Sequence, residues 1–183
     1  MFNERKVAQA AAYLLNLRGG CMSHLKLMKL MYLADRLAYD RYGRPLSGDR
    51  AVSMPHGPVL SKTLNLMDGD EESAPGGWTT WISAKENNEL SLVREVHPGD
   101  LDQLSQADVQ ILDQVFTEFG RMKRWEIRDF SHSLPEWHDP NGSMLPIATE
   151  DIFTALGKTA EEIAGFMDRL EDDRNLDALL ASL

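Results

Sequence analysis

The stretch "LKLMKLMYLADRLAYDRYGRPLSGDRAVSMPHGPV", residues 25–59, carries the strongest secondary-structure pattern in the chain. Its first part predicts a helix over 24–42, because apolar residues recur at i, i+3, i+4 and i+7 and Gly43 can end the helix. The residues at this spacing are Leu30, Leu33, Ala34 and Leu37. Other apolar residues extend the hydrophobic surface around most of the helix, so we expect it to be central. The polar residues left over form one narrow strip that we expect to reach solvent: Lys26, Lys29, Arg36 and Asp40.

The second part of the stretch combines turn and strand features. "RPLSGD" (44–49) is rich in turn formers, and residues 50–54 have the composition of a short strand. In "MPHGPV" (54–59), Pro58 suits the first turn of a helix and Gly57 permits an unusual backbone conformation. We therefore predict a rigid corner between the strand and a helix over about 58–67.

The rest of the chain is predicted to be mainly helical. Helical spacing favours helices over 4–17, 106–120, 123–132 and 149–156, and Ser105 with Asp108 resembles a capping box. "WTTWIS" (78–83) and "LSLVREV" (90–96) instead have the pattern of a β-hairpin. The predicted fold is a mainly α domain around helix 24–42, with a small antiparallel β element at 50–54, 78–83 and 90–96.

Composition places the chain among ordinary globular proteins. It has 183 residues, of which 43% are apolar and 26% charged, enough for one domain with a real core. No apolar run approaches the roughly 20 residues of a membrane span, and the first residues do not have the pattern of a signal peptide. The single cysteine, Cys21, cannot form an internal disulfide. We expect a cytoplasmic protein.

The net charge of −10 is unevenly distributed along the chain. Residues 1–62 contain ten Lys/Arg and four Asp/Glu, a net charge of +6, whereas residues 63–183 contain nine and twenty-five, a net charge of −16. Either the basic and acidic parts pack side by side, or each offers a face to a partner of opposite charge. An acidic chain is a poor nonspecific ligand for nucleic acid.

His56 is the first catalytic candidate, but the sequence does not support it with partners. A general base needs an orienting group and a nucleophile, and the nearby Ser53 and Ser61 form no known nucleophile pattern. The prolines and glycine around His56 make a stiff turn whether or not the imidazole reacts. We therefore predict no catalytic residue, and a structural or surface role for His56.

A metal site could be imagined around His132 and His138, with Asp129 or Glu136 as a further ligand. However, the spacing matches no strong zinc pattern, and no dinucleotide-binding or P-loop motif is present. We predict neither a metal nor a cofactor. A metal-dependent or histidine-based enzyme that uses His56, His132 and His138 remains the first alternative.

A DNA-binding regulator of its own operon is the second alternative. Lys26, Lys29 and Arg36 could contact phosphates. Recognition helices expose polar residues to base edges, however, and helix 24–42 is the most apolar helix of the chain. We therefore do not expect nucleic acid to be the partner.

The pieces "KLMKLMYLAD", "YGRPLSGD" and "MPHGPV" resemble the Panacea domain, the family of SocA-like antitoxins and related phage-associated proteins. "LSQADVQILDQVFTEFG" (104–120) and "SHSLPEW" (131–137) resemble later parts of the same family, so the resemblance covers roughly residues 4–157. It implies a mainly helical domain that neutralises a toxin, encoded by a neighbouring gene, through direct binding. Some such proteins are described as handing the toxin to a AAA+ protease. The resemblance supplies no catalytic residues.

This resemblance and the exposed charge lead us to expect a partner-binding surface at Lys26, Lys29, Arg36, His56 and Trp137. We also divide the chain into a Panacea domain, residues 1–157, and an acidic amphipathic helical segment, residues 158–183. That segment either closes the helical domain or helps to choose the toxin, because a shared scaffold needs a variable element to discriminate among partners.

Overall fold

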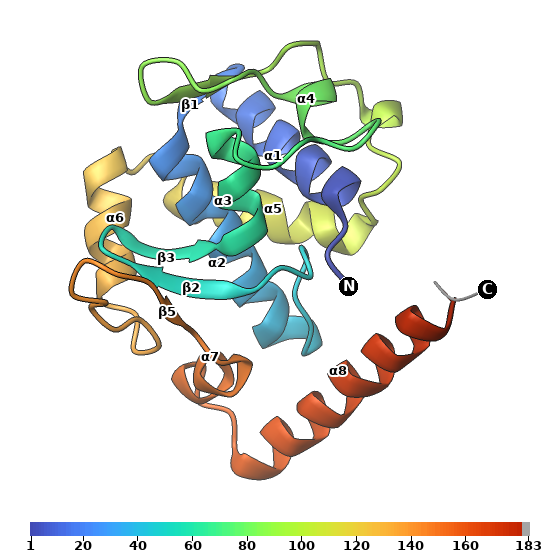
Figure 1. Cartoon of the computed structure of the whole chain (residues 1–183), viewed down its shortest axis with the longest axis vertical. Coiled ribbons are helices and arrows are strands. Elements are labelled where there is room, and N and C mark those ends of the chain that lie inside the picture. The colour runs from blue at the N-terminus through green and yellow to red at the C-terminus, as the bar shows by residue number, and fades with distance from the viewer. Residues whose placement is uncertain (181–183) are drawn as a thin grey trace.

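The computed structural model describes residues 1–180, and the chain folds as a mainly helical domain with two small antiparallel sheets (Figure 1). The helices are α1 (Glu4–Arg18), α2 (His24–Tyr42), α3 (Ser61–Asp68), α4 (Trp78–Trp81), α5 (Gln106–Phe119), α6 (Arg124–His132), α7 (Thr149–Ala155) and α8 (Ala160–Leu180), with a 3₁₀ turn at Pro98–Asp100. The strands are β1 (Cys21–Ser23), β2 (Ala51–Met54), β3 (Gly57–Leu60), β4 (Glu89–Ser91) and β5 (Leu145–Pro146). The predicted fold class is confirmed.

Helix α2 lies at the centre and has the predicted bounds. It packs against α1, α5, α6 and β3, and twelve of its nineteen residues are buried. Leu27, Leu30 and Met31 are at most 1% exposed. Gly43 ends the helix in the left-handed conformation, with φ at 68°, which a glycine adopts without steric cost.

The predicted strand at 50–54 is β2, but the corner that follows it differs from the prediction. Residues 54–57 form a hairpin turn, and Pro58 lies in β3 opposite Ser53 and does not begin a helix. Pro58 fits there because β3 is an edge strand of the β3–β2–β5 sheet, where a missing N–H is tolerated. Helix α3 starts only at Ser61.

The second sheet also corrects a prediction. Residues 78–81 form the short helix α4, whereas 78–83 was predicted as a strand; only Ile82 makes an isolated bridge, to Leu92. Trp78 and Trp81 are three residues apart and both buried, which a helical turn achieves on one face and a strand cannot. Strand β4 covers only the start of the predicted 90–96 and pairs with β1, which was not predicted.

The helices of the C-terminal half follow the predictions closely. The capping box of Ser105 and Asp108 begins α5, and Thr159 and Glu162 form a second one before α8. Helix α8 extends along the edge of the molecule (Figure 1). Its Asp177 carboxylate lies 2.8 Å from the N-terminal amino group. None of its described residues is fully buried. Among the described residues, no helix is both long and apolar enough to span a bilayer.

Candidate functional site

The two lysines in the polar strip of α2 do not reach solvent, which corrects the expectation for them, whereas Arg36 is partly buried and Asp40 is exposed. Lys26 is 5% exposed and Lys29 is 0% exposed. The Lys26 ammonium donates to the carbonyls of Gly120 (2.6 Å) and Met122 (2.7 Å) in the α5–α6 loop. The Lys29 ammonium donates to the carbonyl of Pro58 at 2.6 Å. Since each buried ammonium has a carbonyl partner, Lys26 and Lys29 join α2 to the α5–α6 loop and to β3.

Burial has a strong electrostatic consequence at Lys29. No counter-ion accompanies its ammonium within 4 Å in the described residues, so burial alone lowers the pKa of Lys29 from 10.5 to about 7. Burial also lowers the pKa of Lys26, and the charge of Arg18 adds to this effect. Lys29 is thus a buried amine that changes charge near neutral pH.

Arg36 lies on the same strip of α2, about two turns after Lys29, and is partly buried. Its guanidinium Nε lies 2.7 Å from the Oε1 of Glu136, a carboxylate whose side chain is 0% exposed. The Tyr32 hydroxyl donates to the same oxygen at 2.9 Å. Burial raises the pKa of Tyr32 well above its usual value, and the Glu136 charge adds to the shift. Arg36 therefore ties α2 to the segment after α6, although its edge still reaches solvent.

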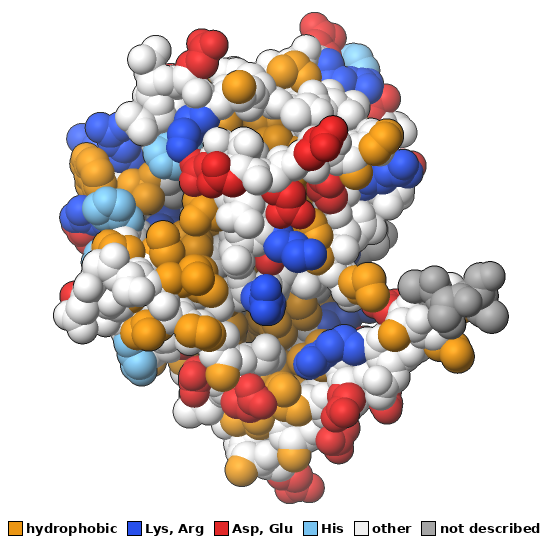
Figure 2. All heavy atoms as spheres, in the orientation of Figure 1, with side chains coloured by type: hydrophobic (Ala, Val, Ile, Leu, Met, Phe, Trp, Pro, Cys, Tyr) orange, Lys and Arg blue, Asp and Glu red, His pale blue; other side chains and the backbone are white. Residues whose placement is uncertain are grey.

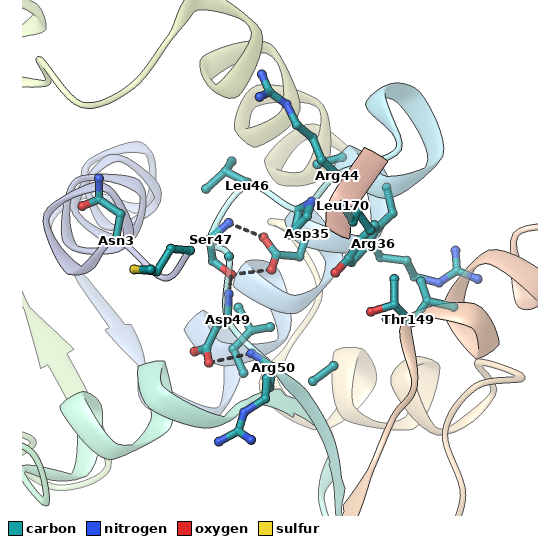
Figure 3. A pocket seen from close by; sticks show the side chains of 18 of the residues that line it. Asn3, Asp35, Arg36, Arg44, Leu46, Ser47, Asp49, Arg50, Thr149 and Leu170 are labelled. Carbon is teal, nitrogen blue, oxygen red and sulfur yellow. Dashed lines mark hydrogen bonds between the residues drawn. The ribbon is translucent and has the colours of Figure 1, made fainter. Parts of the chain in front are cut away.

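The "YGRPLSGD" turn forms a buried polar network beside a large cavity. Asp35 accepts hydrogen bonds from the backbone N–H and the hydroxyl of Ser47, and the Ser47 hydroxyl accepts from the Asp49 N–H (Figure 3). Asp49 in turn caps α3, accepting from the Thr63 N–H and hydroxyl at 2.8 Å each. Burial raises the pKa of Asp35 to about 7, although the bonds from Ser47 oppose the shift. Asp35 and Asp49 therefore fix the backbone of the 44–49 turn and of the start of α3.

The cavity has a volume of about 1250 Å³ and lies between this turn, α7 and α8. Both charge types line it, including Arg36, Arg44, Arg50 and Asp177. Figure 3 shows the arginine side chains spread around it, with Asp35 turned toward Ser47. No single ligand chemistry follows from such a mixed lining.

The tip of the β2–β3 hairpin brings His56 and Trp137 into the same region. Trp137 donates its indole N–H to the Met54 carbonyl at 3.1 Å and stacks on His132, with ring centroids 4.2 Å apart. Gly57 has φ at 93°, and a Cβ there would lie 2.4 Å from the Ser131 hydroxyl, so only glycine fits. His56 itself is exposed beside this packed layer. Of the five predicted binding residues, His56 is thus well exposed, and Trp137 and Arg36 are partly so.

The histidines of the enzyme alternative do not form a metal cluster. Burial lowers the pKa of His132, helped by the charges of Arg128 and Lys29, which favours the neutral imidazole. The side chain of His138 is exposed, while its backbone N–H donates to the Ser53 hydroxyl. Among residues 1–180 there is no group of three or more His, Cys, Asp or Glu side chains that could hold a metal.

The most prominent exposed aromatic residue, Trp125, was missed by the sequence analysis. It lies on α6 and is 46% exposed. The guanidinium carbons of Arg124 and Arg128 lie 5.1 and 4.7 Å from the indole centroid, and the His56 ring lies 6.3 Å away at 68°. We call His56, Arg124, Trp125 and Arg128 the Trp125 surface. The exposure of Trp125 could have been inferred from helical spacing, because Trp125 lies on a different face of α6 from Ile127 and Ser131, which are buried.

Figure 2 shows basic, histidine and hydrophobic side chains gathered along one edge of the molecule, over α6 and the β2–β3 turn. A surface of this composition suits contact with another macromolecule, because aromatic residues and arginine dominate binding energy at protein interfaces.

Comparison with known proteins gives one match. A family model described as "Antitoxin SocA-like, Panacea domain" matches residues 27–138, from the first turn of α2 to the segment that follows α6. Searches of curated proteins and of solved structures found no match.

Proposed function

Because the chain belongs to the family of SocA-like antitoxins with a Panacea domain, we propose that it is the antitoxin of a toxin–antitoxin pair and neutralises a protein toxin by direct binding. The family match carries this proposal. It spans α2, both strands of the β2–β3 hairpin and α6, so it includes the elements that present the Trp125 surface. We place this activity in the cytoplasm, because its reducing environment keeps an exposed thiol such as that of Cys21 reduced.

The test begins with the protein encoded beside this one. We expect its expression alone to stop growth and co-expression with this chain to restore it. A tagged copy of the chain should retain the toxin in a pull-down. Growth arrest that persists on co-expression, together with no complex between the purified proteins, would overturn the proposal.

In this role the chain neutralises the toxin without making or breaking a covalent bond. Neutralisation by binding requires about one antitoxin per toxin, or another fixed ratio, whereas an enzyme would act well below that ratio. A titration of purified toxin activity against this chain therefore separates the two. An end point far below stoichiometry would favour the enzyme alternative.

Delivery of the toxin to a AAA+ protease is a further step of the same proposal. If the chain acts as an adaptor, the half-life of the toxin in cells should shorten when the antitoxin is present and should recover when the protease is absent. An unchanged half-life with restored growth would leave binding alone as the mechanism.

We further propose that α8 contributes to the choice of toxin. This helix lies outside the matched region, and Leu176 and Leu180 on it are 55% and 59% exposed. Its first half is anchored, since Phe166 stacks on Phe153 with centroids 4.8 Å apart. A chain that ends at residue 170 should keep this anchor. If this shortened chain folds as the full chain does but neutralises the toxin more weakly, the role of α8 is supported. Undiminished neutralisation would contradict it.

A further inference from the structure

The Trp125 surface combines an exposed aromatic ring with basic side chains. Trp125 exposes 46% of its area, on a protein whose three other tryptophans are buried or partly buried. Two guanidinium groups lie against its indole, within the distance of a cation–π contact. Such an arrangement offers apolar area and hydrogen-bond donors at one place.

The surface is held rigidly from below. Helix α6 is anchored by Ile127 and Ser131, both 0% exposed, and its first turn is fixed by the Glu126 carboxylate, which accepts from the Lys123 N–H at 2.6 Å. The hairpin that carries His56 packs against α6, where a Cβ on Gly57 would lie 2.4 Å from the Ser131 hydroxyl. Because these side chains stand on packed elements, binding costs little backbone entropy.

The charge of the surface is opposite to that of the protein. The chain has a net charge of −10, yet Arg121, Lys123 and Arg124 lie together at the start of α6, all exposed. Within residues 1–180, none of these three forms an ion pair. Arg128 is paired with Asp129 on the same helix. Free cations around an exposed indole are complementary to carboxylates next to an apolar side chain.

Nucleic acid could also use arginine and tryptophan, through phosphate contacts and base stacking. Two features favour a protein. Glu126 and Asp129 stand among the basic residues of α6, and the whole chain would repel a polyanion. A short acidic segment avoids both problems, because it needs only the few cations around Trp125.

We propose that the Trp125 surface docks an acidic segment of the protein toxin, with a carboxylate on Arg124 and an apolar side chain against Trp125. This inference rests on the proposed function and names the surface and the partner chemistry. Trp125 makes the central apolar contact, and the charge of Arg124 favours acidic segments over neutral or basic ones.

The test uses the full chain and the protein encoded beside it, with affinity measured by calorimetry. We expect Trp125→Ala to weaken binding at least about 30-fold, as for a central aromatic anchor. Arg124→Glu should weaken it about 10-fold or more and flatten the dependence of affinity on salt. Val93→Ala and Lys62→Glu are matched controls on other exposed sites and should bind as the parent does.

Thermal unfolding of each variant shows whether it is folded, and Trp125 is exposed enough for its loss to be tolerated. If the parent binds the toxin and both α6 variants bind equally well, the inference is wrong while the proposed function stands. If the parent does not bind, the proposed function fails and the inference fails with it. Binding of the parent to duplex DNA that Arg124→Glu abolishes, without toxin binding, would assign the surface to nucleic acid and also overturn the inference.

Discussion

Replacement of Lys29 by methionine should remove a pH dependence of stability that the wild-type protein has above neutrality. Burial lowers the pKa of Lys29 from 10.5 to about 7 in the folded protein. Between pH 7 and pH 10.5 the lysine is protonated in the unfolded chain but not in the native state, so the free energy of unfolding increases with pH. Each pKa unit corresponds to about 1.4 kcal/mol, and integration from pH 7 to pH 9 gives a rise of about 2 kcal/mol.

Urea unfolding at pH 7, 8 and 9, followed by circular dichroism, measures this rise. The slope is a cleaner readout than the stability at one pH, because Lys29→Met also leaves the Pro58 carbonyl without its donor, at a cost of about 1–3 kcal/mol. That loss shifts every point equally. Lys62→Met, at an exposed lysine, is the control and should keep the wild-type slope. If Lys29→Met rises with pH as steeply as the wild type, the ammonium is not buried in the native state and the reasoning fails.

Three other substitutions test the network around the same stretch of sequence. Asp49→Ala should lower the free energy of unfolding by about 2 kcal/mol, because the start of α3 loses the carboxylate that Thr63 bonds twice; a urea midpoint equal to that of the wild type would contradict this. Gly57→Ala should cost about 2 kcal/mol or more, since the new Cβ would meet the Ser131 hydroxyl at a positive φ; a variant with unchanged melting temperature would show that the hairpin can relax. For Asp35, the folded pKa of about 7 lies above the ordinary 3.8, so wild-type stability should fall by about 2 kcal/mol from pH 5 to pH 7, and Asp35→Asn should abolish that fall; a variant that keeps it would move the titration to another group.

Predictions from the sequence succeeded where the signal was local. The bounds of α2 followed from apolar periodicity and from Gly43, and the start of α5 followed from Ser105 and Asp108, which contact each other within one turn. The prediction at 78–83 failed because short apolar runs fit a strand and a helical turn equally well. The burial of Trp78 and Trp81 against α1, which selected the helix, is a tertiary contact.

The partner-binding residues show the same limit. The sequence placed Lys26 and Lys29 on one strip of a helix, but a strip of lysines is compatible with solvent or with carbonyl groups of another element. The carbonyls that accept from them come from residues up to 96 positions away, so their positions exist only in the fold. Trp125 shows the converse, since no prediction was made for it, and the structure leaves it exposed while Ile127 of the same helix is buried.

The sequence by itself determined helices α1, α2, α5, α6 and α7, the turn at 44–49 and the family resemblance, since capping, periodicity and turn chemistry act between residues a few positions apart. Only the tertiary structure decided which polar side chains are buried and which aromatic ring is exposed. Burial depends on which distant elements pack over a surface, and a buried ammonium with a carbonyl partner is as compatible with the local sequence as a hydrated one.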